Sequence, residues 1–552
     1  MPVGPEARRW STVGFRRTVL AVTRTVTTTT RLLDVLDLVR EDARIQVVFT
    51  VEPGSAFTDG VVDFVRSFGG RLVPWDQVLG MSFDLVIAAS EAGDLHLLDA
   101  PVVVLPHGAG HNKYIKTEPG APRSVSGFRA DQLVRDGRVV PIAIVLSHEE
   151  QLNQLALSCP PALPRAVVAG DVCLDRLSAS RSHRSRYRRA LGLHDRQRLV
   201  VVNSTWGARS VFAQHLRLPA RMLAELPADE YRVALVLHPS VWFGHSPYQV
   251  RGWLASAIGA GLLLVPPHEG WRATLVAADV LVSDHGSLSL YGAALGVPLM
   301  LGAFDDEEVV PTSPMAELAD HAPRLRPDAD LRTQIETAIA DHDPTIHDPI
   351  TRRAFALRDQ ATRVLRTLLY DTMSLAQDDA EFDARPVGDP EPEVRPVTAH
   401  RVVTTVSHDS TVAVERFPAT LPEPSWPSHN AEHDQHLAVE HDSFDTALLD
   451  SAAVLLASVR PHDAVGWGRS ALAAHPGARV AATADSLVVR GNGGRLHLFD
   501  LDRTAVEPSI AASAVYALSA ADRLTPAQDR LTVRLGSRTH EVRFRFRDSY
   551  PG

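Results

Sequence analysis

The chain has 552 residues, a hydrophobic content of 45%, a charged content of 22% and a formal net charge of −10. The length predicts about two to four domains, and the composition is that of a globular protein rather than a disordered or fibrous one. The net negative charge gives no global signature of nucleic-acid binding, and because no apolar run reaches membrane-spanning length, we expect a cytoplasmic protein.

Residues 14 to about 178 alternate strand patterns with helix patterns. The candidate strands are RRTVLAVTR, ARIQVVFTV, FDLVIAAS, APVVVLPHG and PIAIVLSHE. Residues 28–40 and 58–69 are the candidate helices between the first of them. Strands that alternate with helices predict a parallel sheet with helices on both faces.

The same alternation starts again near Arg198. Its candidate strands are LVVVNS, VALVLH, LLLVPP, DVLVSD and VPLML. We therefore expect an α/β protein with two facing Rossmann-like domains, residues 1–180 and 181–373. Residues 344–372 have a helical pattern and could pack back across the pair.

The composition changes beyond the second domain. Residues 374–398 are rich in Asp, Glu and Pro, which favours an extended, mobile linker. Residues 399–552 are expected to form a separate α+β or mostly β module, because Asn492–Gly493 predicts one hairpin and LTVRLGSRTHEVRFRF a second. In VRFRFR the arginines fall on one face of a strand; they could touch an anionic polymer or lipid headgroups, or be only the solvent side of a sheet.

The most informative segment is DVLVSDHGSLSLYGAALGVPLML, from Asp279 to Leu301. It predicts a buried strand, a polar turn containing Ser283, Asp284 and Gly286, and a helix that Ser287 caps. A small-residue turn that leads into a helix N-terminus offers backbone N–H groups and a partial positive charge to a phosphate. The alternative is an ordinary strand-to-helix connection, in which Asp284 simply accepts a backbone N–H.

Comparable turns follow three other predicted strands. They contain His107–Gly108, Thr205 and His238. Since the carboxyl ends of parallel strands share one edge of a sheet, these turns predict a ligand-binding cleft between the two domains. The chain has only two lysines, Lys113 and Lys116, and both follow the His107–Gly108 turn, which makes Gly108 and Lys113 candidates for acceptor or phosphate binding.

Two histidines are candidate catalytic residues. An imidazole titrates near neutral pH, so His107 is a candidate general base, and the glycine after it allows substrate to come close. His238 could donate to a phosphate oxygen of the donor. Each could instead be a structural histidine at the end of a strand.

Metal and cofactor sites are not expected. His107 and His111 have a metal-like spacing, but the glycines between them argue against a helix that would hold both on one face. Cys159 and Cys173 give neither a disulfide framework nor a metal spacing. The acidic run 305–308 could bind a ribose hydroxyl, although a solvated loop explains it better.

Residues 14–372 resemble the CDP-glycerol glycerophosphotransferases of teichoic-acid synthesis, a family with the GT-B glycosyltransferase-like fold. DVLVSDHGS, LHP and LPHG are similar to the family's turns at strand ends, AGDVCLDRL to its segment before the domain crossing, and NSTWGARS to its Pro-Thr-Trp-Arg strand end. The chain departs from the pattern at Gly207, where an arginine usually follows the tryptophan.

The resemblance implies a transferase that uses a nucleotide-diphosphate donor such as CDP-glycerol as its substrate. The acceptor would be a cell-envelope polymer or a lipid-linked precursor, with peripheral contact to the inner face of the membrane. One alternative is a UDP-sugar enzyme, either a glycosyltransferase or a 2-epimerase-like protein. Another is a non-catalytic module whose cleft binds a nucleotide or a partner.

Overall fold

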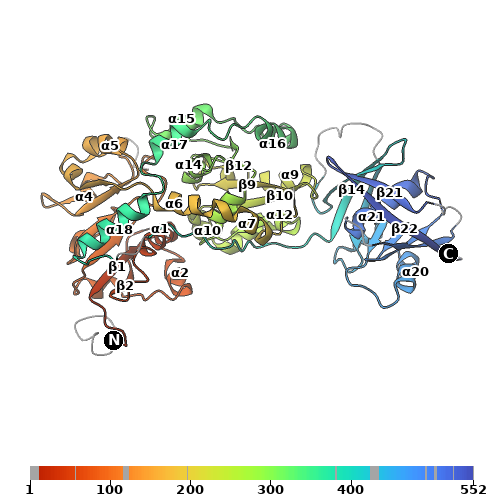
Figure 1. Ribbon diagram of the computed structural model, residues 1–552, viewed down its shortest axis with the longest axis horizontal. Coiled ribbons are helices and arrows are strands. Elements are labelled where there is room, and N and C mark those ends of the chain that lie inside the picture. Colours follow the sequence, from red (N-terminus) through yellow and green to blue (C-terminus); the bar gives the residue numbers. More distant parts are fainter. Residues whose placement is uncertain are drawn as a thin grey trace.

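The computed structural model describes residues 12–55, 58–115, 124–195, 197–378, 382–422, 434–491, 494–502, 506–525 and 528–550. Within these ranges the chain forms three units in a row: an N-terminal α/β unit, a central α/β unit and a C-terminal β unit (Figure 1). No helix in the described part of the chain is long and apolar enough to cross a membrane.

The N-terminal unit is built on a parallel sheet with the order β2-β1-β3-β4-β7-β8. Its strands are β1 (Arg17–Thr23), β2 (Ile45–Val51), β3 (Leu85–Ala88), β4 (Val102–Val104), β7 (Ala143–Leu146) and β8 (Ala166–Val168). Its helices are α1 (Val26–Leu36), α2 (Val61–Ser67), α3 (Trp75–Val78), α4 (Ala130–Leu133), α5 (Glu150–Ser158) and α6 (Val172–Ser180), and the short strands β5 (Val134–Arg135) and β6 (Arg138–Val139) form a small hairpin. All strands predicted here are present, whereas β8 was not predicted.

The central unit has a second parallel sheet, with the order β11-β10-β9-β12-β13. Its strands are β9 (Arg198–Ser204), β10 (Tyr231–Leu237), β11 (Leu263–Val265), β12 (Val280–Ser283) and β13 (Leu299–Leu301). Its helices are α7 (Arg184–Ala190), α8 (Val211–Gln214), α9 (Leu218–Glu225), α10 (Pro239–His245), α11 (Pro247–Trp253), α12 (Ala255–Gly259), α13 (Trp271–Ala277), α14 (Ser287–Ala294), α15 (Pro314–His321) and α16 (Leu331–Ala340).

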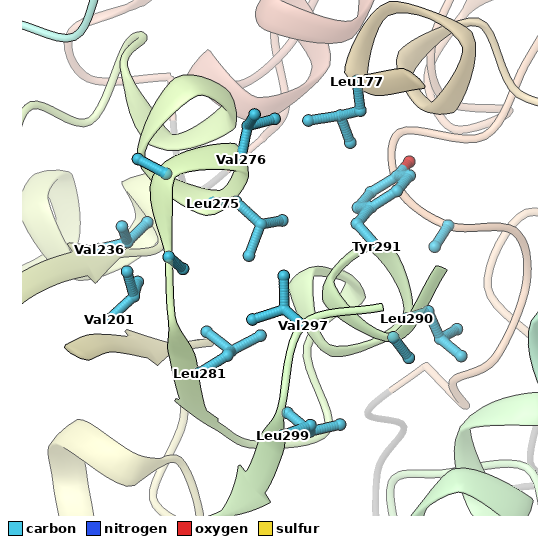
Figure 2. Packing of buried hydrophobic residues seen from close by; sticks show 14 of the residues in the cluster. Leu177, Val201, Val236, Leu275, Val276, Leu281, Leu290, Tyr291, Val297 and Leu299 are labelled. Atoms are coloured by element: carbon cyan, nitrogen blue, oxygen red, sulfur yellow. The ribbon is translucent and has the colours of Figure 1, made fainter. Parts of the chain in front are cut away.

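The strands of this sheet are continuously apolar because helices cover both faces. Figure 2 shows one face, where Val201, Val236 and Leu281 of the sheet pack against Leu275 of α13 and Leu290 of α14. All but Val236 are fully buried, and Val236 is 7% exposed. Burial of this kind is the main source of stability for such a layer.

Two helices after the central unit return the chain to both α/β units, as the sequence predicted. Helix α17 (Asp348–Ala354) contacts α14 and α15 of the central unit. Helix α18 (Ala361–Thr372) contributes Leu365 and Leu369 to the core of the N-terminal unit. The Asp175 carboxylate of α6 accepts N–H groups at the start of α18, so this crossing is fixed by buried polar contacts as well as by packing.

Residues 382–398 are extended, as predicted, and parts of this segment pack against the central unit. Val387 is buried in the central core, and its backbone bonds to the Ser180 and Tyr187 side chains. Glu393 exchanges two backbone hydrogen bonds with Leu264 of β11, the edge strand of the central sheet. We call this segment the strap; it covers a sheet edge that would otherwise expose unpaired N–H and C=O groups.

The C-terminal unit is a closed barrel with the order β14-β15-β21-β22-β20-β19-β18-β17-β16. Its strands are β14 (Ala399–Val406), β15 (Val412–Pro418), β16 (Asp434–Glu440), β17 (Val454–Leu456), β18 (Val480–Ala482), β19 (Ser486–Arg490), β20 (Leu496–Leu501), β21 (Arg530–Leu535) and β22 (Arg538–Tyr550). It also carries α19 (Thr446–Asp450), α20 (Ala464–Ala474) and α21 (Pro508–Ala520), the last buried in one core with the strands. The sequence predicted a mostly β or α+β module but not the closure of its sheet.

The predicted hairpins of the barrel are found in part. Strands β19 and β20 pair antiparallel, although Asn492–Gly493 lies outside the described residues. Strands β21 and β22 form the second hairpin. In β22, Val542 and Phe544 are buried while Arg543 and Arg545 are exposed, which matches the predicted alternation.

Candidate functional site

A cavity of about 470 Å³ lies between the two α/β units. The carboxyl ends of strands from both sheets surround it, which is the edge where open α/β sheets bind ligands. The predicted residues that line it are His107, Gly108, Lys113, Thr205, His238, Gly286 and Ser287. The fold thus brings together the turns that the sequence singled out in separate segments.

Ser283 and Asp284 have a different position from the one expected of donor-binding residues. Both side chains are fully buried. The Asp284 carboxylate accepts N–H groups of Thr205, Val211 and Gly286 at 3.0–3.2 Å. Ser283 Oγ accepts bonds from the Asn203 and Ser289 side chains, each at 2.8 Å. These two side chains stabilise the turn from its buried side and not from the cavity. For Asp284 this is the structural alternative that the sequence left open.

The turn leads directly into α14. The expectation that Ser287 caps this helix was wrong, because Gly286 is the capping position and Ser287 is the first helical residue. Ser287 and Gly286 nevertheless line the cavity at the N-terminal end of the helix. At Gly108, an added Cβ would lie 2.4 Å from Ser287 Oγ, so a larger residue would displace the Ser287 hydroxyl from its present position.

His107 lines the cavity, and its side chain is exposed there. A backbone hydrogen bond at Ala89 favours the protonated ring, so the ring donates to the Ala89 carbonyl and its second nitrogen is left as an acceptor. Desolvation inside the cleft lowers the pKa of His107 to about 4, and the positive charges of Arg31 and Lys113 add to the shift. The imidazole is therefore neutral at pH 7, the state that a general base requires.

His238 lies at the opposite wall and caps α10. Its Nδ1 accepts the Ser240 N–H at 3.1 Å, so in the neutral ring the proton is on Nε2. Nε2 lies 3.4 Å from Thr27 Oγ1 of α1, across the cleft. Desolvation, with smaller contributions from Lys113 and His107, lowers the pKa of His238 to about 3. The ring is thus both a structural cap and a neutral N–H donor at the cavity.

Lys113 crosses the cleft from the N-terminal unit. Tyr114 N–H donates to Glu308 O at 2.8 Å and Val310 N–H to Asn112 O at 2.9 Å, which pairs the two loops as a short antiparallel bridge. Lys113 Nζ lies 3.4 Å from Thr205 Oγ1 and 4.0 Å from Glu308 Oε1. The bridge therefore places a lysine of one unit at the strand ends of the other. Lys116 lies outside the described residues.

The acidic run 305–308 is the solvated loop that the sequence favoured only in part, since Asp306 and Glu307 are exposed whereas Asp305 is buried and Glu308 half-buried. Asp305 and Glu307 both pair with Arg209 at 3.0 Å. Glu308 lines the cavity, and its Oε2 lies 3.1 Å from Nε2 of the buried His285. Sequence reasoning missed Glu308 because nothing local distinguishes it from its acidic neighbours.

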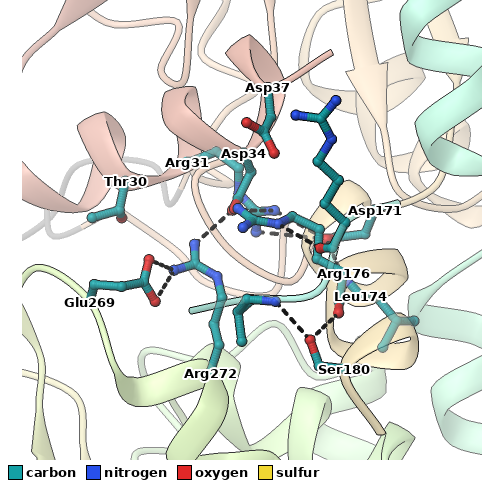
Figure 3. Close-up of polar contacts among 12 residues, drawn as sticks. Thr30, Arg31, Asp34, Asp37, Asp171, Leu174, Arg176, Ser180, Glu269 and Arg272 are labelled. Atoms are coloured by element: carbon teal, nitrogen blue, oxygen red, sulfur yellow. Dashed lines mark hydrogen bonds and ion pairs between the residues drawn. The ribbon is translucent and has the colours of Figure 1, made fainter. Parts of the chain in front are cut away.

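A buried charge network at the wall of the cavity also escaped prediction (Figure 3). Arg31 of α1 pairs with Asp171 at 3.1 Å. Asp34 of the same helix pairs with Arg272 of the central unit at 2.7 Å. The Tyr291 hydroxyl of α14 donates to Asp171 Oδ2 at 2.9 Å. Since loss of one partner would leave an uncompensated buried charge, this network fixes the relative position of the two units.

Nothing in the cleft forms a metal centre from the described residues, where no three His, Cys, Asp or Glu side chains gather in a suitable cluster. His111 also lines the cavity, but it donates its Nδ1–H to Ser126 O at 2.7 Å. Burial lowers the pKa of His111 to about 4. Its ring packs against Phe128 and supports the loop that carries Lys113.

No family model and no curated protein matches the chain. The similarities found are to solved structures. The wall teichoic acid polymerase TagF is similar at 10% identity and a TM-score of 0.47, over 65% of this chain and 89% of that one. A UDP-GlcNAc 2-epimerase from Neisseria meningitidis bound to UDP-GlcNAc (12%, TM-score 0.40, 65% and 99%) and S. aureus MnaA with UDP (8%, 0.39, 67% and 100%) are also similar. Such identities and scores assign no activity, so the function rests on the cleft residues.

Proposed function

We propose that this cleft binds a nucleotide-diphosphate donor and transfers its polyol-phosphate or glycosyl group to an acceptor hydroxyl. CDP-glycerol or a related CDP-polyol is our first choice of donor, and a cell-envelope polymer or lipid-linked precursor our choice of acceptor. One observation carries the proposal. His107 and His238 come from different α/β units and line the same cavity as Lys113 and the N-terminus of α14.

The donor phosphates fit the side of the cavity formed by the central unit. The Gly286–Ser287 turn offers the N-terminus of α14, where backbone N–H groups and the helix dipole favour an anion. Lys113 and the Thr205 hydroxyl lie beside it. Asp284 holds this turn in place from behind and so would act on the donor only through the backbone.

His107 would activate the acceptor. For a CDP-polyol, the acceptor hydroxyl loses its proton to His107, and its oxygen attacks the phosphorus that carries the polyol. The bond from this phosphorus to CMP breaks, and CMP leaves with the electron pair. The Nε2–H of His238 and the Lys113 ammonium would stabilise the charge that develops on the phosphate oxygens.

The first test is a thermal-shift comparison of CDP, UDP, GDP and TDP, because a ligand that binds the native state raises its apparent stability. We expect CDP to give the largest shift. Turnover of CDP-glycerol against UDP-sugars then separates the polyol-phosphate transferase from the UDP-sugar enzymes. Binding without turnover of any donor would support the non-catalytic alternative, and the absence of nucleotide binding would contradict the proposal.

A further inference from the structure

Glu308 places a negative charge in a cavity that Arg31, Lys113 and Arg272 line with positive charge, with Glu91 as the second carboxylate of the lining. Its side chain is only 10% exposed and lies between Lys113 of the N-terminal unit and His285 of the central unit. Its backbone is fixed as well, since Glu308 O accepts Tyr114 N–H across the cleft and Glu308 N–H donates to Asp305 O at 3.2 Å. The carboxylate therefore stays beside the lysine.

The position of Lys113 makes Glu308 a competitor of any bound phosphate. Lys113 Nζ lies between the Glu308 carboxylate and Thr205 Oγ1, next to the Gly286–Ser287 turn. An ammonium group that approaches a phosphate at this turn must give up part of its attraction to Glu308. In addition, the carboxylate repels a phosphate directly, and in a cleft of low polarity both effects are larger than in water.

We propose that Glu308 is an internal counter-ion that competes with the donor phosphates for Lys113 and so lowers the affinity of the cleft for diphosphates. The inference rests on the proposed function and adds a positioning residue to it. Before a donor binds, Glu308 holds Lys113 and keeps the two loops bridged. After transfer, it takes Lys113 back from the phosphate of the leaving nucleotide, which favours release.

The test is a double-mutant cycle with Glu308→Gln and Lys113→Met, read by calorimetry with inorganic pyrophosphate and with CDP. Glu308→Gln should tighten binding of both probes by roughly five- to tenfold, because one competing charge is removed. Lys113→Met should weaken binding, and in the double variant the gain from Glu308→Gln should disappear, since the coupling passes through the lysine.

Two further variants keep the test independent of folding. Glu307→Gln alters the neighbouring acid of the same run, which pairs with Arg209, and should leave both affinities within about twofold, the spread of an uncoupled surface site. Glu308→Asp keeps the charge and should bind pyrophosphate nearly as the unmutated protein does. A thermal melt of each variant confirms that it is folded.

The outcomes separate this inference from the proposed function. Unchanged or weaker binding by a folded Glu308→Gln, or a gain that persists without Lys113, overturns the inference while nucleotide binding stands. Tighter pyrophosphate binding with no CDP binding in any variant supports the counter-ion and contradicts the proposed function. Absence of binding by either probe to every variant overturns both.

Discussion

The two sides of the cleft are built in different ways. On the central side, the turn from 283 to 287 is fixed from within its own unit by a buried carboxylate, since Asp284 binds a backbone N–H of its own turn and one of the adjacent strand end, 79 residues earlier in the chain. On the N-terminal side, the loop from 107 to 114 also depends on contacts that cross the cleft, since Lys113 and Tyr114 both contact Glu308 of the central unit. A turn that is already in place within one unit suits the binding of the donor phosphates. A loop that depends on contacts with the other unit suits catalytic groups that reach the donor only when the two units are together.

The largest effect should come from the N-terminal side. His107→Ala should lower turnover by roughly two to four orders of magnitude, because a positioned general base is lost, and should leave donor affinity nearly intact. Steady-state kinetics and calorimetry with CDP measure the two quantities. His148→Ala is the matched control: this histidine also follows a strand of the same sheet, but it bonds to Glu150 N–H outside the cavity. Near-normal turnover of the His107 variant would remove it from the mechanism.

A substitution in the turn of the central side should lower both the stability of the protein and its affinity for the donor. Asp284→Ala would leave backbone N–H groups of Thr205, Val211 and Gly286 without their buried acceptor, at a cost of about 3 kcal/mol or more. Denaturant unfolding and CDP calorimetry should both show the loss. Ser283→Ala removes a buried side chain of the same turn without removing a charge, and should cost less. If Asp284→Ala melts normally and binds CDP normally, the central side is not pre-formed by this carboxylate.

The contact between the two sides can be tested at Gly108. Gly108→Ala places a methyl group against Ser287 Oγ, so the Ser287 hydroxyl must rotate away from its place in the cavity or the loop must shift, at a cost of up to about 1–3 kcal/mol. We expect roughly tenfold weaker CDP binding, equivalent to ~1.4 kcal/mol, with the donor turn itself unchanged. Gly388→Ala is the control, since an added Cβ there meets nothing within 4 Å. Equal effects of the two substitutions would mean that the approach of Gly108 to Ser287 does not matter.

The sequence predicted those features of the two sides that depend on short segments of the chain. Continuous apolar strands and small polar turns revealed both sheets and most cavity-lining turns, because strand period and turn chemistry are properties of short segments. It did not distinguish the buried Asp284 from a ligand-facing one, nor Glu308 from Asp305 and Glu307, since burial and partner are decided by tertiary packing. The charge network of Arg31 was invisible for the same reason: Asp171 and Tyr291, which bind its guanidinium, lie 140 and 260 residues further along the chain.

The contribution of the strap, which leads from the α/β units to the barrel, can be tested with two shortened chains. A chain ending at residue 398 should keep a cooperative melt and CDP binding, whereas one ending at residue 378 should melt several degrees lower, as loss of about 1–2 kcal/mol predicts for a domain of this size. The reason is that the shorter chain loses Val387 from the central core and Glu393 from the edge of β11. Equal melts of the two chains would show that the strap adds nothing. Insolubility of both would show that the barrel is needed, through contacts such as Arg416 with Asp229.

The smallest expected effect is on the pH dependence of catalysis, which tests whether a donor on the central side shifts the pKa of His107 on the N-terminal side. In the free protein the pKa of His107 is lowered to about 4 by desolvation and by Arg31 and Lys113. A base works only when deprotonated, so the acid limb of kcat/KM, which reports the free protein, should fall near that value. A bound diphosphate offsets the two positive charges and favours the imidazolium, so the acid limb of kcat should lie at higher pH, by about one unit. Parallel pH profiles of kcat and kcat/KM measure the difference, and coincident limbs would contradict a donor seated beside His107.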